Sequence, residues 1–321
     1  MQFSRREWLT IAAFAVVYLV WGSTYLAIRI GLETMPPMLM AGVRFLIAGT
    51  ILCSWALARG AKWPTRGQWL RSALAGFLML VLGNGGVTWA EQYVPSGIAA
   101  LLVASEPFSL VLLSWGFFGG RRPGLRTTAG LMIGLLGVAL LIMPEVGDAK
   151  TGGLMLAGSI AIILAAVAWA AGSLYLRKAD LPESSTLSTG MQMLIAGAML
   201  GSFGLSRGEG NAFDPAKFST HSLLAFGYLI CFGSILAFSA YSWLITATTP
   251  ARLSTYAYVN PVIAVLLGSV VAHEPIAPLA WVAMFVIVAS VALVTTGEVE
   301  DLQEGHEDEV VVLPGTLGEQ T

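Results

Sequence analysis

Residues 154–176 read LMLAGSIAIILAAVAWAAGSLYL, a stretch of 23 residues without a charged side chain. A helix that crosses the hydrocarbon core of a bilayer needs about 20 mainly apolar residues. Lipid cannot provide hydrogen-bond partners for the backbone, but in a helix the backbone N–H and C=O groups pair within the segment. The stretch therefore predicts a transmembrane helix.

Apolar stretches of this kind recur along the whole chain. Of its 321 residues, 56% are hydrophobic and 11% are charged, whereas soluble domains carry about 25% charged residues. The length of the runs favours helices over the shorter alternating strands of a membrane barrel. The ten predicted helices lie near residues 9–31, 37–58, 70–92, 95–119, 127–143, 154–176, 185–206, 222–245, 250–272 and 279–297. The first run is too long for a secretory signal and lacks a small-residue cleavage site, so we expect it to be retained.

The Lys and Arg residues are distributed unevenly between the predicted loops. Short loops rich in these residues tend to stay in the cytoplasm. With the N-terminus inside, the inner loops hold most of the basic residues and the outer loops hold only Lys150, Arg207 and Lys217. An even number of helices returns the C-terminus to the cytoplasm, where we expect the acidic tail, residues 298–321, to be disordered.

The two halves of the chain resemble each other at an offset of 148 to 154 residues. The matching positions are Trp21 with Trp169, Arg29 with Arg177, Ile47-Ala48-Gly49 with Ile195-Ala196-Gly197, Glu106-Pro107 with Asn260-Pro261, and Val138-Ala139-Leu140 with Val291-Ala292-Leu293. Since each half holds five helices, the second copy begins on the opposite side of the membrane. The sequence thus predicts an all-α membrane protein with ten transmembrane helices, arranged as two inverted five-helix repeats over residues 1–149 and 150–297.

Several motifs in this arrangement belong together. They are Trp21-Gly22-Ser23 with Tyr25, the tract EQYVPSGIAA at residues 91–100, and Pro250-Ala251 followed by Asn260-Pro261 and Glu274. Over nearly the whole chain these residues resemble the EamA-type members of the drug/metabolite transporter superfamily, and the tract around residues 91–107 is similar to a YedA-like branch. The resemblance implies a central substrate cavity, cytoplasmic termini and export of solutes.

Two positions depart from the pattern of that family. Asn260 stands where many members have Glu before the proline, and Gly119-Gly120 replaces the Gly-Glu that commonly ends the fourth helix. Charge-coupling roles attributed to those positions therefore do not carry over to this chain.

Glu106 is the first candidate for a functional residue. It lies eleven residues beyond Pro95, which places it about 16 Å along the helix and near the centre of the bilayer. A central carboxylate is costly and usually faces a cavity or a partner. Two interpretations remain open, namely binding of a substrate or a coupling proton, and a purely structural hydrogen bond.

Arg44 lies about 10 Å inside the second predicted helix, too deep for its charge to reach the interface easily. We expect a negatively charged partner for Arg44. Glu91 and Glu106 are the available acidic residues, and Arg29 competes with Arg44 for them. The guanidinium group is suited to a substrate carboxylate, but it also suits a link between the second and third helices.

Two prolines and a set of aromatic and amide side chains complete the candidate site. Pro107 and Pro261 each lack an N–H, so we expect two helix kinks that either form cavity walls or serve packing. The candidate substrate-binding residues are Trp21, Tyr25, Arg44, Asn84, Glu106, Tyr256, Tyr258 and Asn260, a mixture typical of a site for an amphipathic ligand.

The sequence also disfavours several functions. It has no phosphate-binding loop for ATP, its His residues lie near predicted helix ends or in the tail, and it has no basic patch for nucleic acid. We expect no cofactor and no metal. The prediction is a secondary carrier in the cell inner membrane, with the bilayer and a small metabolite, amino acid or amphipathic drug as partners and with protons as candidate coupling ions. An exchanger of sugar phosphates or nucleotide-linked solutes is the main alternative, ahead of a channel or a membrane enzyme.

Overall fold

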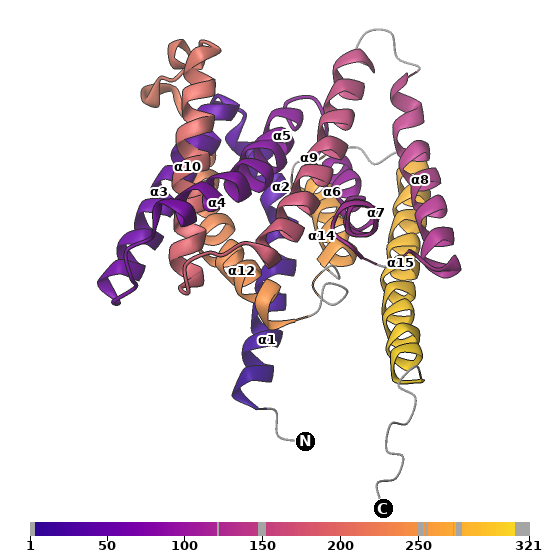
Figure 1. Cartoon of the computed structure of the whole chain (residues 1–321). Helices are drawn as coiled ribbons and strands as arrows, with labels where there is room; N and C mark the ends of the chain where they lie inside the picture. Colours follow the sequence, from indigo (N-terminus) through magenta and orange to yellow (C-terminus); the bar gives the residue numbers. More distant parts are fainter. Residues whose placement is uncertain are drawn as a thin grey trace, which may run out of the picture.

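The computed structural model of the chain describes residues 4–120, 122–146, 152–248, 253, 256–271, 273 and 278–311. Within these residues the structure is helical and contains no strand (Figure 1). In the first half the elements are α1 (Arg5–Val16), η1 (Val17–Trp21), α2 (Gly22–Gly31), α3 (Pro37–Ala58), α4 (Arg66–Gly76), η2 (Phe77–Asn84), α5 (Gly85–Ala90), α6 (Ser96–Val103), α7 (Glu106–Phe117) and α8 (Leu125–Val146). In the second half they are α9 (Gly152–Lys178), α10 (Ser185–Ser206), η3 (Glu209–Asn211), η4 (Pro215–Lys217), α11 (Thr220–Tyr228), η5 (Leu229–Ala237), α12 (Phe238–Ala247), α14 (Tyr256–Val271) and α15 (Pro278–Val311).

Helix is present in each of the ten predicted apolar runs. Six of these helical stretches are long and apolar enough to cross a membrane, and the described part of the chain holds further, shorter apolar helices. The six are Arg5–Gly31, Pro37–Ala58, Arg66–Ala90, Ser96–Phe117, Gly153–Lys178 and Thr220–Ala247. The structure thus confirms an all-helical fold with several candidate spans, whereas the count of ten membrane crossings stays a prediction.

The two largest clusters of buried apolar side chains in the described part of the chain form most of the core. One lies between α6, α7, α14 and α15, and the other lies between α3, η2, α10 and α12. Two long helix pairs frame these clusters, because α3 packs along α10 and α8 packs along α15. Between α3 and α10 the approach is close enough to require glycine. A Cβ atom on Gly49 would lie 2.7 Å from the backbone nitrogen of Leu194, and one on Gly197 would lie 2.7 Å from that of Leu46.

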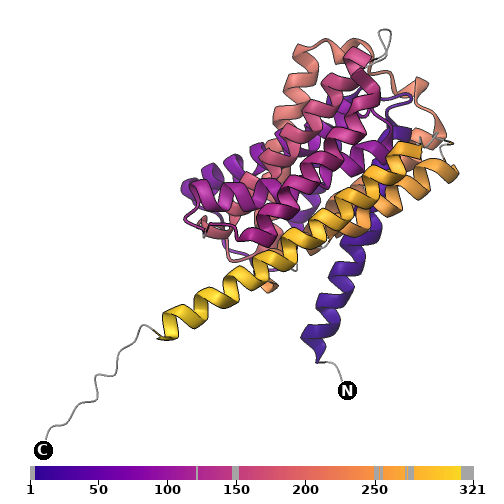
Figure 2. The same cartoon turned by 90° about the vertical axis from the view of Figure 1, so that its right-hand side faces the viewer.

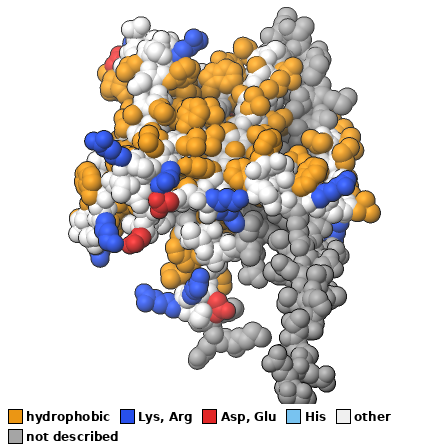
Figure 3. Space-filling model, in the orientation of Figure 1, with side chains coloured by type: hydrophobic (Ala, Val, Ile, Leu, Met, Phe, Trp, Pro, Cys, Tyr) orange, Lys and Arg blue, Asp and Glu red, His pale blue; other side chains and the backbone are white. Residues whose placement is uncertain are grey.

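The beginning of α1 and the end of α15 project from the same end of the bundle (Figures 1 and 2). In the view of Figure 3 the Lys and Arg side chains gather mainly toward this end, while the surface above it is largely apolar. This distribution agrees with the charge asymmetry in the sequence.

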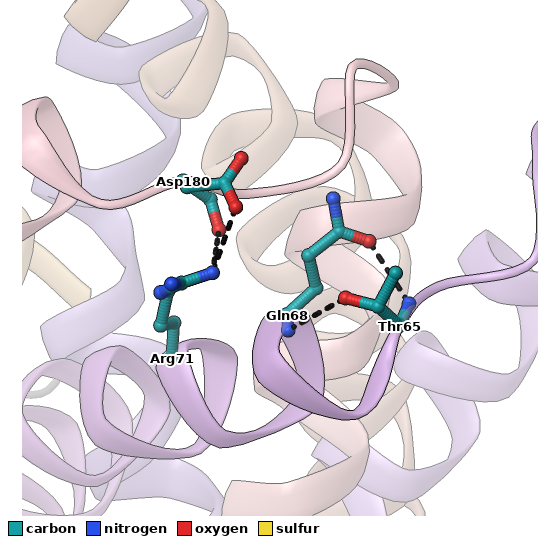
Figure 4. Close-up of polar contacts among 4 residues, drawn as sticks. All are labelled: Thr65, Gln68, Arg71 and Asp180. Carbon is teal, nitrogen blue, oxygen red and sulfur yellow. Dashed lines mark hydrogen bonds and ion pairs between the residues drawn. The ribbon is translucent and has the colours of Figure 1, made fainter.

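At this basic end the two halves of the chain are joined by an ion pair (Figure 4). Nη1 of Arg71 on α4 donates to Oδ2 of Asp180 at 2.7 Å and to its backbone oxygen at 3.3 Å. The helix begins at Arg66 rather than near residue 70 as expected, because Thr65 and Gln68 cap it reciprocally, with Thr65 Oγ1 accepting from the Gln68 N–H and Gln68 Oε1 accepting from the Thr65 N–H.

The two prolines behave differently, although we expected a kink at each. The helix predicted over 95–119 is divided into α6 and α7, and Pro107 lies in the first turn of α7, where a missing N–H costs no helical hydrogen bond. Pro261 lies inside α14, which continues past it as one helix. The first proline thus stands at an interruption, whereas a kink at Pro261 stays a prediction.

The acidic segment after residue 298 also differs from expectation. The backbone of α15 continues as helix to Val311, and residues 312–321 lie outside the described part of the chain. Glu, Leu and Gln are good helix formers, and the sequence between residues 298 and 311 contains no proline that would end a helix.

The close approach of α3 and α10 is testable with a matched pair of substitutions. Gly197→Ala places a Cβ atom 2.7 Å from a backbone atom of α3, whereas a Cβ atom on Gly201 meets nothing within 4 Å. We expect Gly197→Ala to lower the thermal stability of the purified protein, because overpacking costs about 1–3 kcal/mol. Gly201→Ala should leave it unchanged or raise it. Equal unfolding temperatures for the two variants in the same detergent would contradict the predicted interface.

Candidate functional site

A cavity lies inside the bundle, between residues of the two core clusters. The space open to the centres of water molecules is about 90 Å³, which is room for several waters. The cavity is lined by Trp21, Thr24, Tyr25, Ile28, Arg44, Phe45, Leu80, Gly83, Asn84, Val87, Val103, Glu106, Ala165, Ala166, Trp169, Gly233, Ser234, Phe238, Tyr256 and Asn260. Both halves of the chain contribute to this wall.

The cavity brings together nearly all of the predicted site residues. Trp21, Tyr25, Arg44, Asn84, Glu106, Tyr256 and Asn260 line it, and the side chain of Tyr258 lies outside the described part of the structure. These residues lie far apart in the chain, on helical stretches that begin at Arg5, Pro37, Arg66, Glu106 and Tyr256. A polar side chain within an apolar helix has to face the inside of the bundle, which accounts for their convergence.

An aromatic cluster forms one wall of the cavity, with Trp21 at its centre. The ring centroid of Trp21 lies 4.8 Å from that of Tyr241, 5.5 Å from Trp169 and 5.7 Å from Tyr256. The contacts with Trp169 and Tyr256 are edge-to-face, a geometry that aromatic rings prefer. Our list of candidates missed Trp169 and Phe238. Trp169 was detectable as the repeat equivalent of Trp21, whereas no sequence signal distinguished Phe238 from other apolar residues.

Glu106 stands at the interruption between α6 and α7. It is 2% exposed, and the hydroxyl of Tyr256 donates to its Oε2 at 3.2 Å. As the first residue of α7, it lies where the helix dipole favours a negative charge. A smaller cavity of about 10 Å³ is lined by Glu106, Leu110, Ser173, Arg177, Tyr241, Leu253 and Tyr256. Glu106 and Tyr256 therefore line both cavities.

Arg44 has a different partner from the one expected. Its Nη2 donates to Oδ1 of Asn84, and its guanidinium carbon lies 4.4 Å from the ring centroid of Phe45. A neutral amide therefore makes the hydrogen bond for which we expected a carboxylate. The distance along the helix was sufficient to predict burial of Arg44, but it did not show which side chain on the neighbouring helix faces it.

Two residues that line the cavity, Arg44 and Asn260, each hold a buried polar atom without a hydrogen-bond partner, Nε in Arg44 and Oδ1 in Asn260. Both residues are 3% exposed. A buried polar group left unpaired costs about 1–3 kcal/mol, and more when it is charged. An unpaired buried polar atom needs an explanation in a native protein, and an ordered water or a ligand is one.

Three π-helical segments in the described part of the chain border this cavity. They contribute Trp21 from η1, Leu80, Gly83 and Asn84 from η2, and Gly233 and Ser234 from η5. The indole N–H of Trp21 donates to the backbone oxygen of Gly233 at 3.3 Å, which joins two of these segments. π-Helical turns occur frequently at functional sites. Their position supports the cavity as the functional centre of the fold.

A family model for the EamA-like transporter family matches residues 8–143 and 156–296, that is, once in each half of the chain. The chain belongs to the EamA-like transporter family. With its several membrane-spanning candidates, it is a membrane transporter.

Relatives extend over most of the transporter. It is 42% identical over 288 residues to "Uncharacterized inner membrane transporter YedA" of Escherichia coli (strain K12), covering 89% of this chain and 90% of that protein. It is 26% identical to "Uncharacterized transporter YvbV" of Bacillus subtilis (strain 168), covering 89% and 92%. A solved structure titled "Crystal structure of protein" shares the fold with a TM-score of 0.62 at 21% identity, covering 92% of this chain and 99% of that one.

The hydrogen bond between η1 and η5 is testable in the purified transporter. Trp21→Phe removes the N–H that Gly233 accepts, which leaves a carbonyl without this donor and should cost about 1–3 kcal/mol. Trp115→Phe is the matched control, because Trp115 is 46% exposed on the outer surface. We expect a lower thermal unfolding temperature for Trp21→Phe alone. Equal temperatures for the two variants would argue against the structural role of Trp21.

Proposed function

We propose that this transporter is a secondary carrier that exports small metabolites, amino acids or amphipathic drugs across the inner membrane of a bacterium by alternating access. In this proposal ten helices form two inverted repeats and both termini are cytoplasmic. The location follows the name of the YedA relative, and the direction follows the resemblance to exporters. The two inverted halves rock about a central site and expose it to each side in turn.

The observation that carries the proposal is the position of the cavity between equivalent residues of the two halves. Trp21 and Trp169 are repeat equivalents, as are Glu106 and Asn260, and all of them line the cavity. The two tryptophans meet edge-to-face with their ring centroids 5.5 Å apart. A site shared in this way changes its surroundings when the two halves move relative to each other.

The helix contacts support an inverted repeat. Each predicted helix in the first half has its counterpart five helices later. If one helix packs on a second, the counterparts of the two helices also pack on each other. The element α2 packs on α14 and α7 packs on α9, while η2 packs on α9 and η5 packs on η1 and α2. The pairs α3 with α10 and α8 with α15 join counterparts directly. The segments η2 and η5 also occupy equivalent helices.

An exchanger of sugar phosphates or nucleotide-linked solutes is less well supported. Such ligands carry two or more negative charges and are typically held by clustered basic residues. Among the described residues that line the cavity, Arg44 is the one Lys or Arg. Arg29, the other candidate, donates instead to the backbone oxygen of Glu91 at 2.6 Å.

Counterflow tests the carrier mechanism. Proteoliposomes are loaded with an unlabelled solute and diluted into buffer that contains a trace of the labelled solute, for a panel of amino acids, small metabolites and cationic drugs. We expect transient accumulation of label for at least one solute, because a carrier returns loaded from the unlabelled side. Protein-free liposomes are the control. Uptake that is insensitive to the internal load would indicate a channel. The absence of transient accumulation for every solute would contradict the carrier mechanism.

Glu106 is the proposed site of proton coupling. The ionisable groups that share a cavity with it are Tyr25, Arg44, Arg177, Tyr241 and Tyr256. A conformational change that alters the neighbours of Glu106 or its access to water can therefore change the protonation of its carboxyl group. A nearly isosteric amide at this position cannot change its charge.

We therefore expect Glu106→Gln to fold and to lose the dependence of transport on external pH. The measurement is uptake into proteoliposomes across mildly acidic to mildly alkaline pH, at matched protein content. Tyr256→Phe is the companion variant, because it removes the hydroxyl at 3.2 Å from Glu106 and leaves the carboxyl group in place. We expect this variant to keep a pH dependence. An unchanged profile for Glu106→Gln would mean that the carboxyl group serves only as a structural hydrogen-bonding group.

A further inference from the structure

One face of α3 is an exposed apolar stripe that ends in an arginine. Ile47, Ile51 and Trp55 follow one another at intervals of about one turn and are 38%, 47% and 59% exposed. Arg59 lies one turn further on, as the exposed residue that follows the helix. Its guanidinium carbon lies 4.7 Å from the ring centroid of Trp55. The described lining of the cavity includes none of these residues, so the stripe is separate from the candidate functional site.

The stripe has about the length of one lipid leaflet. From Ile47 to Arg59 the helix rises about 18 Å, and half of the hydrocarbon core of a bilayer measures about 15 Å. A helix of 22 residues that crosses the bilayer places Ile47 near the midplane and Arg59 at the level of the headgroups. The stripe can therefore lie along an acyl chain over the whole length of the chain.

The guanidinium group of Arg59 has hydrogen-bonding capacity that the protein does not use. The carbonyls at the end of α3 already have other partners, since the N–H of Gly60 donates to Leu57 at 2.9 Å and that of Ala61 donates to Ala56 at 3.1 Å. With the described residues, the guanidinium group makes no hydrogen bond or ion pair besides its contact with the ring. A cation–π contact leaves the N–H donors of the group available. These donors match the oxygens of a phosphate group.

The loop after α3 adds further positive charge. Residues 59–66 read RGAKWPTR, with three basic residues and no acidic one. Lys62 lies 3.8 Å from Glu183, but their side chains are 88% and 91% exposed, and such a pair attracts only weakly. Trp63 in the same loop is 75% exposed, which is typical of the boundary between lipid and water. This end of α3 therefore favours a membrane ligand with a net negative charge.

The equivalent helix of the second half lacks this combination. At an offset of 148 residues Trp55 corresponds to Phe203 and Arg59 to Arg207. Phe203 is also exposed, but Arg207 makes no cation–π contact with a described ring. Residues 207–214 read RGEGNAFD, with one basic and two acidic residues. The two arginines lie at opposite faces of the membrane in the proposed topology, so the features of an anion site occur in one leaflet.

We propose that α3 binds an anionic phospholipid of the leaflet at the basic end, with the headgroup phosphate on Arg59 and one acyl chain along Ile47, Ile51 and Trp55. This lipid site goes beyond the proposed carrier function and does not depend on it. In the proposed topology the leaflet is the cytoplasmic one, where anionic lipids attract basic segments next to the membrane. A zwitterionic lipid carries the same phosphate, but its ammonium group is repelled by the basic loop.

The test is native mass spectrometry of the full-length protein in detergent, after bound lipid has been removed. The protein is titrated with phosphatidylglycerol and with phosphatidylcholine of the same acyl chains, and glycerol 3-phosphate serves as a soluble source of the phosphate group. We expect phosphatidylglycerol to bind about tenfold more tightly than phosphatidylcholine, because hydrogen bonds between charged groups are strong. Equimolar glycerol 3-phosphate should not displace the lipid, since it lacks the acyl chains. Equal affinities of the two lipids, or displacement by glycerol 3-phosphate, would overturn the proposal.

Three arginine variants show whether the preference belongs to this site. Arg59→Gln should lower the affinity for phosphatidylglycerol to that for phosphatidylcholine, a loss of about tenfold. Arg122→Gln is the control at the same end of the bundle, because Arg122 is exposed on the loop between α7 and α8. Arg207→Gln is the control at the equivalent position, and we expect both controls to keep the preference. Equal losses for Arg59→Gln and Arg122→Gln would mean a general effect of surface charge and would overturn the proposal, as would an unchanged affinity of Arg59→Gln.

A fourth variant tests the ring contact. Trp55→Leu keeps an apolar side chain on the stripe and removes the ring next to Arg59, so we expect the affinity for phosphatidylglycerol to fall by about two- to fivefold. All of these side chains are exposed, so the substitutions leave the packed core intact. An unchanged affinity of Trp55→Leu would contradict the role of the stacked arginine.

Discussion

The burial of two ionisable side chains, Arg44 and Glu106, is the constraint on which the rest of the bundle depends. A charged residue at the centre of a membrane helix costs about 2.5–3.5 kcal/mol on insertion, and each of these two residues is at most 3% exposed. The fold departs from regular helix where it accommodates them. Asn84, which accepts from Arg44, ends the π-helical segment η2, and Glu106 begins a new helix after an interruption. Irregular backbone of this kind is tolerated at membrane depth only where it lines a cavity or is covered by protein.

Much of the fold was predictable because lipid imposes simple rules on sequence. The uncharged stretch 154–176 was predictable as a helix, because an α-helix pairs its backbone N–H and C=O groups within the segment. Apart from the helix, only a closed β-barrel pairs these groups in lipid. The same rule predicted that polar residues inside such stretches face inward, which is why residues as distant in the chain as Trp21 and Asn260 line one cavity. The repeat offset paired Trp169 with Trp21, although Trp169 was not among the predicted site residues.

The features that were not predictable depend on tertiary contacts. Pro107 follows Glu106 and Pro261 follows Asn260, its repeat equivalent, yet only Pro107 stands at a helix interruption. A proline restricts its own backbone, but the neighbouring helices decide whether the chain bends, breaks or continues. The choice of Asn84 over a carboxylate as the partner of Arg44 depends on the rotation of one helix against another. Apolar periodicity does not fix that rotation when all faces of a helix are apolar.

The two halves differ in charge at two pairs of equivalent buried positions. At an offset of 148 residues Arg44 corresponds to Gln192, which is 2% exposed, donates to Oγ of Ser188 at 3.2 Å, and has no partner for its Oε1. Glu106 corresponds to Asn260 at an offset of 154 residues, so the charged member of each pair lies in the first half. If alternating access exchanges the conformations of the two halves, neutral amides take the places of Arg44 and Glu106 around the solute. Such a change weakens the hold on an ionic group in one state relative to the other, and a conformational cycle needs a difference of this kind to bind a solute on one side and release it on the other.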